Sequence, residues 1–366
     1  MINVIWYVAA ACGVSMVLTF AAMPVLLKIC RVKGLYDLPD GERKVHHVAV
    51  PRLGGLLFLP ASLVAFTLMF LLEQGAGERL TLRSSTVVMA VGVFLIYIIG
   101  LVDDLVGMKA WHKFAVQLVA ALAMPFCGLL INNFYGLFGL YDLPFWFSYP
   151  LTVFTILLII NSINLIDGID GLASGLSVCI LASFIYYFLQ MENTFVYAIV
   201  AAGLLGTVLA FFCFNMFGSI RSNTKIFMGD SGSLFLGYVL AYLAIKYEMN
   251  NPAILPYRSD ALLISCTLVL IPTFDLVRVA LGRLFRRRPV FGADKTHIHH
   301  RIMEAGFTMH QTWGIIIGLH FFFCLVNWLL AYLNVSYTYI FAADVLLFML
   351  FLKACALLAE HRRQLA

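Results

Sequence analysis

Charged side chains are scarce in this sequence: they make up 12% of its 366 residues, whereas 62% are hydrophobic. A soluble protein of this length could not bury so much apolar side chain. Charge is entirely missing from long stretches, namely Val14–Leu27, Thr86–Val102, Leu151–Ile163 and Ala261–Ile271. Since about 20 apolar residues cross a bilayer as a helix, these stretches predict membrane-spanning helices.

Three further absences narrow the class. The apolar stretches do not alternate with polar residues, which excludes a membrane β-barrel. The first of them lacks a basic start and a small-residue cleavage site, so we interpret it as a permanent helix and not a signal peptide. No two of the eight cysteines form a C-x-x-C pair, so neither a disulfide framework nor a metal knuckle is indicated.

The hydrophobic pattern predicts an all-α, polytopic helical bundle with about eleven spans. The expected spans are 4–27, 53–72, 86–102, 112–131, 146–163, 172–190, 195–215, 232–247, 261–281, 312–332 and 335–357. We expect one transmembrane domain covering residues 1–366.

The basic residues predict the orientation of this bundle. With the N-terminus outside, twenty of the 24 Lys and Arg residues fall on the cytosolic side, and only Arg79, Arg83, Lys246 and Arg258 fall outside. This bias follows the positive-inside rule and places the C-terminus in the cytosol. The net charge of +5 is therefore a topology signal, and no nucleic-acid partner is implied.

Polar chemistry is concentrated on the same cytosolic side, in five segments: Asp40–Arg52, Gly100–Lys113, Asn161–Gly171, Ile226–Ser233 and Asp294–Arg301. Ionisable groups at membrane depth are costly and mark functional sites by default. The five segments together therefore predict one composite cytosolic site.

Acids dominate three of the segments. Asp103 and Asp104 form an adjacent pair that suits metal, base or phosphate chemistry, or else a solvated helix end. Asn164, Asp167 and Asp170 are three residues apart and would share one side of a helical turn if that segment is helical; the alternative is an ordinary turn that ends the span. Asp230 suits a divalent ion, and Asp230 or Ser231 could cap the eighth span; the two roles are not exclusive.

The histidines His297, His299 and His300 are too closely spaced to favour one tetrahedral zinc. We expect them, with Lys295 and Arg301, to contact phosphate oxygens. Asp275 and Arg278 should pair with each other structurally, and Arg286–Arg288 should lie against anionic headgroups.

Two functions fit these features. An enzyme would join a phosphorylated cytosolic substrate to a membrane-embedded one, whereas a secondary transporter would use the acids as an ion relay. Transporters place such groups near mid-membrane between internal repeats. Here the acids lie at helix ends on one face, which favours the enzyme.

Four ordered motifs then carry a resemblance: G-L-V-D-D, N-x-x-N-x-x-D-G-I-D-G-L, F-M-G-D-S-G-S and H-I-H-H-R-I-M-E-A-G-F. In order and spacing the chain resembles the polyprenyl-phosphate N-acetylhexosamine-1-phosphate transferases (glycosyltransferase family 4), from about Gly34 to Phe307. The resemblance implies a bacterial inner-membrane enzyme that transfers a sugar-1-phosphate from a UDP-sugar to undecaprenyl phosphate and releases UMP. It also implies Mg²⁺, for which Mn²⁺ would substitute, and leaves a homodimer open.

The resemblance also implies site residues. Asp103 resembles the base for the lipid phosphate, with Asp104 beside it as a second catalytic acid, and Asp230 with Asn164 resembles the magnesium ligands. Uracil binding would fall to Asp170 and Phe227, with Asn215 leading into that motif. The residues expected at phosphate or sugar are His297, His299, His300, Lys113, Lys44, His46, Asp167 and Lys225.

The histidine segment is similar to the branch that uses UDP-N-acetylglucosamine for O-antigen and other lipopolysaccharide, enterobacterial common antigen or teichoic acid linkage. The branch that takes UDP-MurNAc-pentapeptide has three consecutive histidines, whereas residue 298 here is isoleucine. We therefore expect N-acetylglucosamine, with N-acetylgalactosamine, a deoxy-aminosugar and a covalent or direct mechanism left open.

Overall fold

The computed structural model describes residues 2–37, 49–75, 84–191, 194–252, 255–289 and 296–365. Three of the residues expected at phosphate or sugar, Lys44, His46 and Lys295, lie outside these ranges. Eleven of the described helices have 17 residues or more, as the sequence predicted. They are α1 (Ile2–Lys33), α2 (Phe58–Gly75), α3 (Ser84–Val106), α4 (Ala110–Phe126), α5 (Phe145–Ile166), α6 (Leu172–Leu189), α7 (Phe195–Met216), α8 (Gly229–Glu248), α9 (Ala261–Phe285), α11 (Met309–Tyr332) and α12 (Tyr337–Leu365).

Nine of these helices are long and apolar enough to cross a membrane. The other two are α4, which has 17 residues, and α8, which carries Asp230, Lys246 and Glu248. The prediction of an all-α, multi-pass membrane protein is confirmed. The remaining described elements are small: α10 (Ile298–Glu304), the 3-10 turns η1 (Gly54–Leu57) and η2 (Leu137–Gly139), and two short strands.

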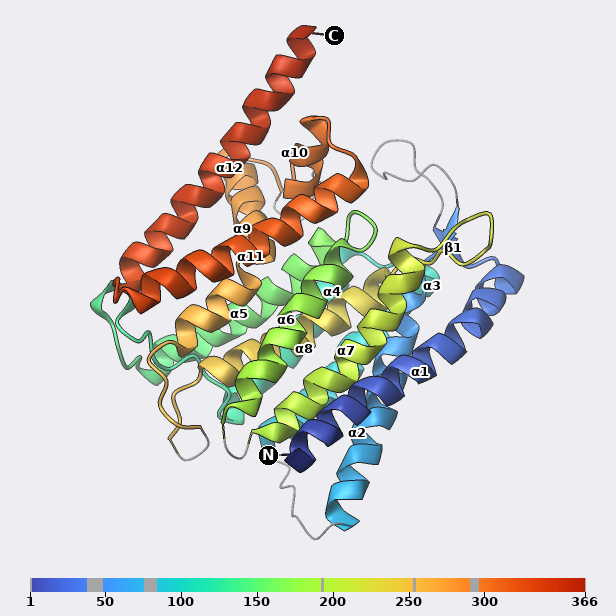
Figure 1. Ribbon diagram of the computed structural model, residues 1–366, viewed down its shortest axis with the longest axis horizontal. Helices are drawn as coiled ribbons and strands as arrows, with labels where there is room; N and C mark the ends of the chain where they lie inside the picture. The colour runs from blue at the N-terminus through green and yellow to red at the C-terminus, as the bar shows by residue number, and fades with distance from the viewer. Residues whose placement is uncertain are drawn as a thin grey trace.

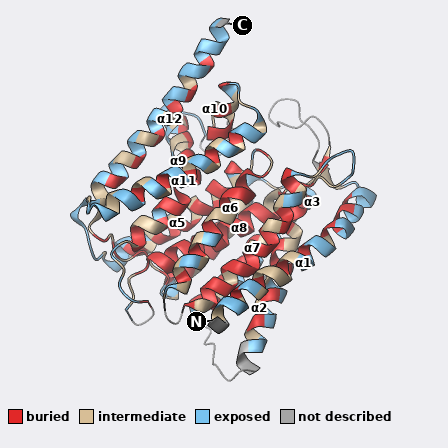
Figure 2. Ribbon diagram, viewed as in Figure 1, coloured by how far each residue is buried: buried red, intermediate tan, exposed pale blue. Residues whose placement is uncertain are grey.

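The bundle is built around α8. Every residue of this helix from Ser231 to Glu248 is buried, and α3, α5, α6 and α9 pack against it. Figure 2 shows this burial as a red centre, while α1, α11 and α12 carry exposed faces on the periphery. The exposed side chains there are largely apolar, for example Trp6, Leu325 and Trp328, as expected where helices face lipid and not water.

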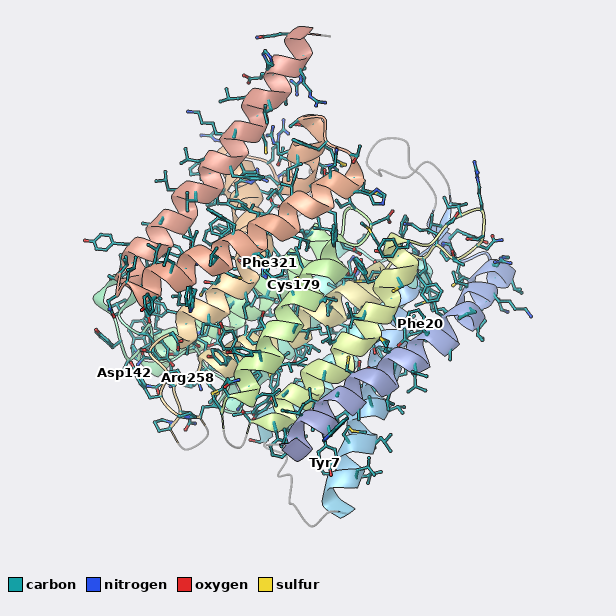
Figure 3. The ribbon with its side chains drawn as sticks, in the orientation of Figure 1. Tyr7, Phe20, Asp142, Cys179, Arg258 and Phe321 are labelled. Atoms are coloured by element: carbon teal, nitrogen blue, oxygen red, sulfur yellow. The ribbon has the colours of Figure 1, made fainter. Side chains whose placement is uncertain are left out.

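The two chain ends lie at opposite ends of the bundle (Figure 1). The N-terminus begins α1 at the end that also carries the loops of Asp142 and Arg258, both labelled in Figure 3. The other end carries α10, the strands and the C-terminal part of α12.

Backbone hydrogen bonds connect the chain between α1 and α2 to the start of α8, at the end of the bundle that carries the strands. Strand β1 (Tyr36–Asp37) pairs antiparallel with β2 (Val50–Pro51), with Tyr36 opposite Pro51. The chain after β2 then contacts the start of α8: the N–H of Gly54 donates to the carbonyl of Phe227 at 2.9 Å, and that of Gly55 to Met228 at 2.8 Å. A Cβ at Gly55 would lie 2.1 Å from the Cα of Gly232, so only glycine permits this approach.

Candidate active site

An acid–lysine cluster joins three helices at one end of the bundle. The Nζ of Lys113, in α4, lies 3.2 Å from Oδ2 of Asp103 in α3 and 2.5 Å from Oδ2 of Asp230 in α8. The amide of Asn164, at the end of α5, donates to Oδ1 of Asp230 at 3.1 Å and to the hydroxyl of Ser233 at 2.8 Å. A chain of contacts therefore connects four residues that the sequence singled out, although they are up to 127 positions apart.

Asp103 is held at the end of α3 by the turn that stops the helix. Gly107 has φ of +77°, its N–H donates to the carbonyl of Asp103 at 2.8 Å, and the N–H of Met108 donates to Oδ1 of Asp103 at 2.7 Å. One carboxylate oxygen is thus fixed by backbone, and the other faces Lys113. The side chain keeps a partly exposed edge, which a substrate could reach.

Asp104 has a different environment from its neighbour. It is 5% exposed, and its two oxygens accept the backbone N–H groups of Asp230 at 2.8 Å and Ser231 at 2.9 Å. These N–H groups are among the first four of α8, which have no partner within the helix. Asp104 therefore caps α8 from another helix.

The interpretation of Asp230 or Ser231 as the cap of the eighth span is wrong. The residue in the N-cap position of α8 is Met228, and no side chain of its own segment caps the helix. Gly229 has φ of +75°, and a Cβ there would lie 2.6 Å from Oδ2 of Asp104. The glycine thus admits the capping carboxylate, which leaves the side chain of Asp230 available to the cluster.

The segment after α5 is a turn and not a helix. Helix α5 ends at Ile166, and residues 167–171 turn before α6 begins at Leu172. The condition under which Asn164, Asp167 and Asp170 would share one helical face is therefore not met, because only Asn164 is helical, and the alternative of a span-ending turn is confirmed. Gly171, with φ of +75°, supplies the left-handed residue that starts α6.

Asn215 and Lys225 fasten this turn to the segment before α8. The N–H of Gly171 donates to Oδ1 of Asn215 at 2.6 Å, and the Asn215 amide donates to the carbonyl of Ile226 at 2.9 Å. Lys225 Nζ lies 2.6 Å from Oδ2 of Asp170. The same turn is held on its other side by the indole of Trp313, which donates to the carbonyl of Gly171 at 3.0 Å.

Asp167 lies between these two clusters. Burial, reinforced by the nearby carboxylates of Asp170, Asp230 and Asp104, raises the pKa of Asp167 to about 7. A carboxyl group with such a pKa exchanges a proton near neutrality and responds to any cation that enters the site. Asp167 belongs to the motif N-x-x-N-x-x-D-G-I-D-G-L, and its role was the least specific of the acids in that motif.

The histidine segment is oriented by Asp275. Oδ2 of this acid lies 2.8 Å from Nδ1 of His297, and Oδ1 accepts from the N–H of Ile298 at 3.0 Å. The expected pair with Arg278 is present, at 2.7 Å. Asp275 thus does more than pair with its neighbour in α9, because it also fixes the start of α10.

His299 brings the histidine segment onto the acidic turn. A Cβ at Gly168 would lie 2.3 Å from Nε2 of His299, so the ring lies directly over this glycine. Burial, and then the proximity of His300, lower the pKa of His299 to about 3. Its Nδ1 is buried without a hydrogen-bond partner among the residues that the structure describes.

Sequence reasoning overlooked several supporting residues. Ser233 and Trp313 drew no attention because a serine or a tryptophan in an apolar helix is common. The glycines at positions 54, 55, 100 and 229 were signals that could have been followed, since each permits backbone to meet another helix or the Asp104 carboxylate. Gly100, for example, allows α3 to approach the Cα of Ser231.

The described residues contain no group of three or more His, Cys, Asp or Glu side chains placed to hold a metal ion. The site instead has two carboxylates, Asp103 and Asp230, that both contact the ammonium group of Lys113. A magnesium ion typically takes one or two carboxylates and completes its shell with water and substrate phosphates. Asp230 and its neighbours fit such an ion.

Comparison with known proteins agrees with this geometry. Residues 86–248, from α3 to the end of α8, match the family described as Glycosyl transferase family 4. The expected family resemblance is confirmed. The matched region contains the acid pair, Lys113, the acidic turn and Asp230, which are the residues that the structure gathers.

Curated relatives extend the similarity over most of the chain. A probable undecaprenyl-phosphate N-acetylglucosaminyl 1-phosphate transferase of Bacillus subtilis (strain 168) is 29% identical over 85% of this chain and 81% of its own length. Undecaprenyl-phosphate alpha-N-acetylglucosaminyl 1-phosphate transferases of Yersinia pestis and Escherichia coli (strain K12) are each 28% identical. These cover 82% and 79% of this chain, and 77% and 74% of their own lengths.

Proposed function

We propose that this protein transfers N-acetylglucosamine-1-phosphate from UDP-N-acetylglucosamine to undecaprenyl phosphate. A phosphate oxygen of the acceptor attacks the sugar-bearing phosphorus, the bond from that phosphorus to the UMP phosphate breaks, and UMP leaves. The product is a lipid-linked pyrophosphate sugar that starts a cell-surface glycan. The contact of Lys113 with both Asp103 and Asp230 carries the proposal, since it joins the acids of two motifs at one point.

Charge control is the main demand of this reaction, because two phosphates must approach each other. Magnesium bound at Asp230 would screen their repulsion and stabilise the displacement. Asn164 orients that carboxylate through its amide, and Lys113 holds a positive charge between Asp230 and Asp103. These residues keep the charges in place before either substrate arrives.

Acceptor activation belongs to Asp103 in this scheme. Its Oδ1 is fixed by Met108 and its Oδ2 faces Lys113, so the group is positioned to keep the acceptor phosphate deprotonated. Asp104 acts as a positioning residue, because both its oxygens are used in holding the start of α8. The two adjacent acids thus have separate tasks.

Donor binding is assigned to the turn and the residues around it. Phe227 would stack on the uracil and Asp170 would accept its N–H, with Lys225 exchanging its contact with Asp170 for the donor phosphates. His297, His299 and His300 would meet the pyrophosphate and sugar. Among the residues that the structure describes, Nδ1 of His299 has no hydrogen-bond partner, which is consistent with a ligand that completes its hydrogen bonding.

The membrane arrangement follows from the acceptor. An isoprenoid tail remains in the bilayer, whereas the nucleotide sugar is cytosolic, so the site must lie where helices meet the cytosol. We propose that the end with α10 and the C-terminus faces the cytosol of a bacterial inner membrane, with the N-terminus outside. The twenty-to-four distribution of basic residues supports this orientation.

The test uses the purified protein with undecaprenyl phosphate, magnesium and a panel of UDP-sugars, and measures UMP release. UDP-N-acetylglucosamine should give the highest kcat/KM, with UDP-N-acetylgalactosamine and UDP-MurNAc-pentapeptide well below it. Release with a different sugar would retain the reaction class and overturn the sugar. No UMP with any donor would overturn the proposal.

A further inference from the structure

A basic hollow lies at the end of α9, next to α10. Its empty volume is about 340 Å³ with the open mouth included. Five arginines and Thr296 line it, and its described lining contains no carboxylate. The arginines are Arg278, Arg283, Arg286, Arg288 and Arg301.

The way α9 ends brings these side chains together. Arg287 has φ of +54°, its N–H donates to the carbonyl of Leu284 at 3.0 Å, and the N–H of Arg288 donates to Arg283 at 2.9 Å. These are the two bonds of a Schellman motif, with arginine in the position usually taken by glycine. The chain therefore turns back, so that Arg286 and Arg288 line the hollow and Arg287 does not.

The hollow is separate from the acid–lysine cluster. Arg278 connects the hollow to the histidine segment, since it donates to Asp275 at 2.7 Å and to the carbonyl of Thr296 at 2.5 Å, while the other oxygen of Asp275 contacts His297. Arg301 lies two residues after His299 in α10, about 200° around the helix. The hollow thus lies on the opposite side of the histidine segment from Gly168.

The surroundings of the hollow are those of a membrane interface. The last two turns of α9 expose Leu281, Leu284 and Phe285, the last of these at 82%. Exposed apolar side chains on a membrane-spanning helix face acyl chains, so the adjacent arginines lie at headgroup depth. Basic pockets between helices at this depth bind lipid head groups.

We propose that this hollow binds the phosphate of an anionic membrane phospholipid. Guanidinium groups bind phosphate oxygens in pairs of parallel hydrogen bonds, and several of them converge here. A bound headgroup would hold Arg278 and, through Asp275, the base of the histidine segment. The site goes beyond the proposed transfer reaction, and its test measures binding without turnover.

The experiment titrates the purified full-length protein in detergent with phosphatidylglycerol and records the thermal unfolding midpoint. Phosphatidylcholine at equal concentration tests whether the anionic charge is needed, and inorganic phosphate tests a soluble source. Phosphatidylglycerol should raise Tm by a few degrees, on the order expected for ligand linkage. The other two additions should leave it unchanged.

Three single variants in one segment provide the matched set. Arg286→Gln and Arg288→Gln should each weaken the apparent affinity for phosphatidylglycerol roughly ten-fold, the size of one charge-assisted hydrogen bond. Arg287→Gln, which removes the same charge outside the hollow, should stay within about two-fold of the wild type. All three side chains are exposed, so the variants should fold.

Native mass spectrometry of the same samples counts bound lipid and does not depend on unfolding. Retention of phosphatidylglycerol by the wild type and Arg287→Gln, with loss from the other two, supports the proposal. Equal binding by all three variants, or an equal response to phosphatidylcholine, overturns it. A response to inorganic phosphate that the lipid does not reproduce overturns the lipid assignment.

Discussion

The carboxylate of Asp104 accepts the backbone N–H of Asp230 at 2.8 Å, so one acid of the pair fixes the backbone of the acid opposite it. The neighbouring Asp103 contacts the same region through Lys113. The two adjacent acids therefore have different roles: Asp104 stabilises the backbone at the start of α8, and Asp103 is the acid that we propose contacts the acceptor phosphate.

This division predicts opposite consequences for the two acids. Asp104→Ala leaves two N–H groups at the start of α8 without acceptors, which should cost about 1–3 kcal/mol of stability. Asp103→Asn should fold normally and lose most of its turnover with little change in KM for the donor. Thermal unfolding and steady-state kinetics on both variants measure the split. A larger loss of stability in Asp103→Asn than in Asp104→Ala would argue against it.

Lys113 should compete with magnesium for Asp230. Replacing it by glutamine removes a positive charge that lies 2.5 Å from Oδ2 of Asp230, so the apparent magnesium affinity should rise several-fold by Coulomb's law. Turnover should fall, because Asp103 loses its counter-charge. Lys113→Arg, which keeps the charge, is the control for the magnesium titration. Unchanged magnesium dependence in the glutamine variant would show that the ion does not bind beside this lysine.

Gly168 tests the contact between the acidic turn and the histidine segment. A methyl group here would meet Nε2 of His299 at 2.3 Å, so Gly168→Ala should displace the ring and lower kcat/KM by at least about ten-fold. Gly314→Ala is the control, because nothing lies within 4 Å of a Cβ there. The double variant Gly168→Ala with His299→Ala should recover stability but not activity. Full activity in Gly168→Ala would mean that the ring position does not matter.

His299 predicts an acid sensitivity of the fold. Its pKa is about 3 in the folded protein against 6.5 for an ordinary histidine. A lowered folded pKa means that its stabilising contribution is complete above pH 6.5 and is lost as the pH falls toward 3. The loss is on the order of 1.4 kcal/mol for each pH unit. The Tm of His299→Gln should therefore fall less than that of the wild type between pH 7 and pH 4.5; parallel curves would contradict the buried, neutral ring.

Runs of apolar residues were sufficient to predict the helices, because a helix that crosses a bilayer needs about 20 consecutive apolar residues, and such a run can be read directly from the sequence. The eleven long helices begin and end within several residues of the expected spans. Helix α8 shows the limit of this argument. It was expected as an ordinary span, yet it is buried at the centre of the bundle together with Lys246 and Glu248.

The sequence predicted which acidic, basic and histidine residues lie in the site, but it did not predict which residues they contact. Asp104 and Asp230 are 126 positions apart, and nothing local in the sequence says that one caps the helix of the other. The spacing of Asn164, Asp167 and Asp170 left open whether residues 167–171 are helical or form a turn, and the contact of the Gly171 N–H with the side chain of Asn215 stabilises a turn. Contacts between distant segments depend on how helices pack, which periodicity does not report.

The central claim is tested most directly by identifying the lipid product. Purified protein incubated with UDP-N-acetylglucosamine, undecaprenyl phosphate and magnesium should yield undecaprenyl-pyrophosphoryl-N-acetylglucosamine by mass spectrometry, in equal amount to the UMP released. Asp230→Asn, confirmed as folded by its thermal unfolding, should yield neither. The account would be contradicted by wild-type protein that forms no lipid-linked sugar, or by product at a near-normal rate from Asp230→Asn.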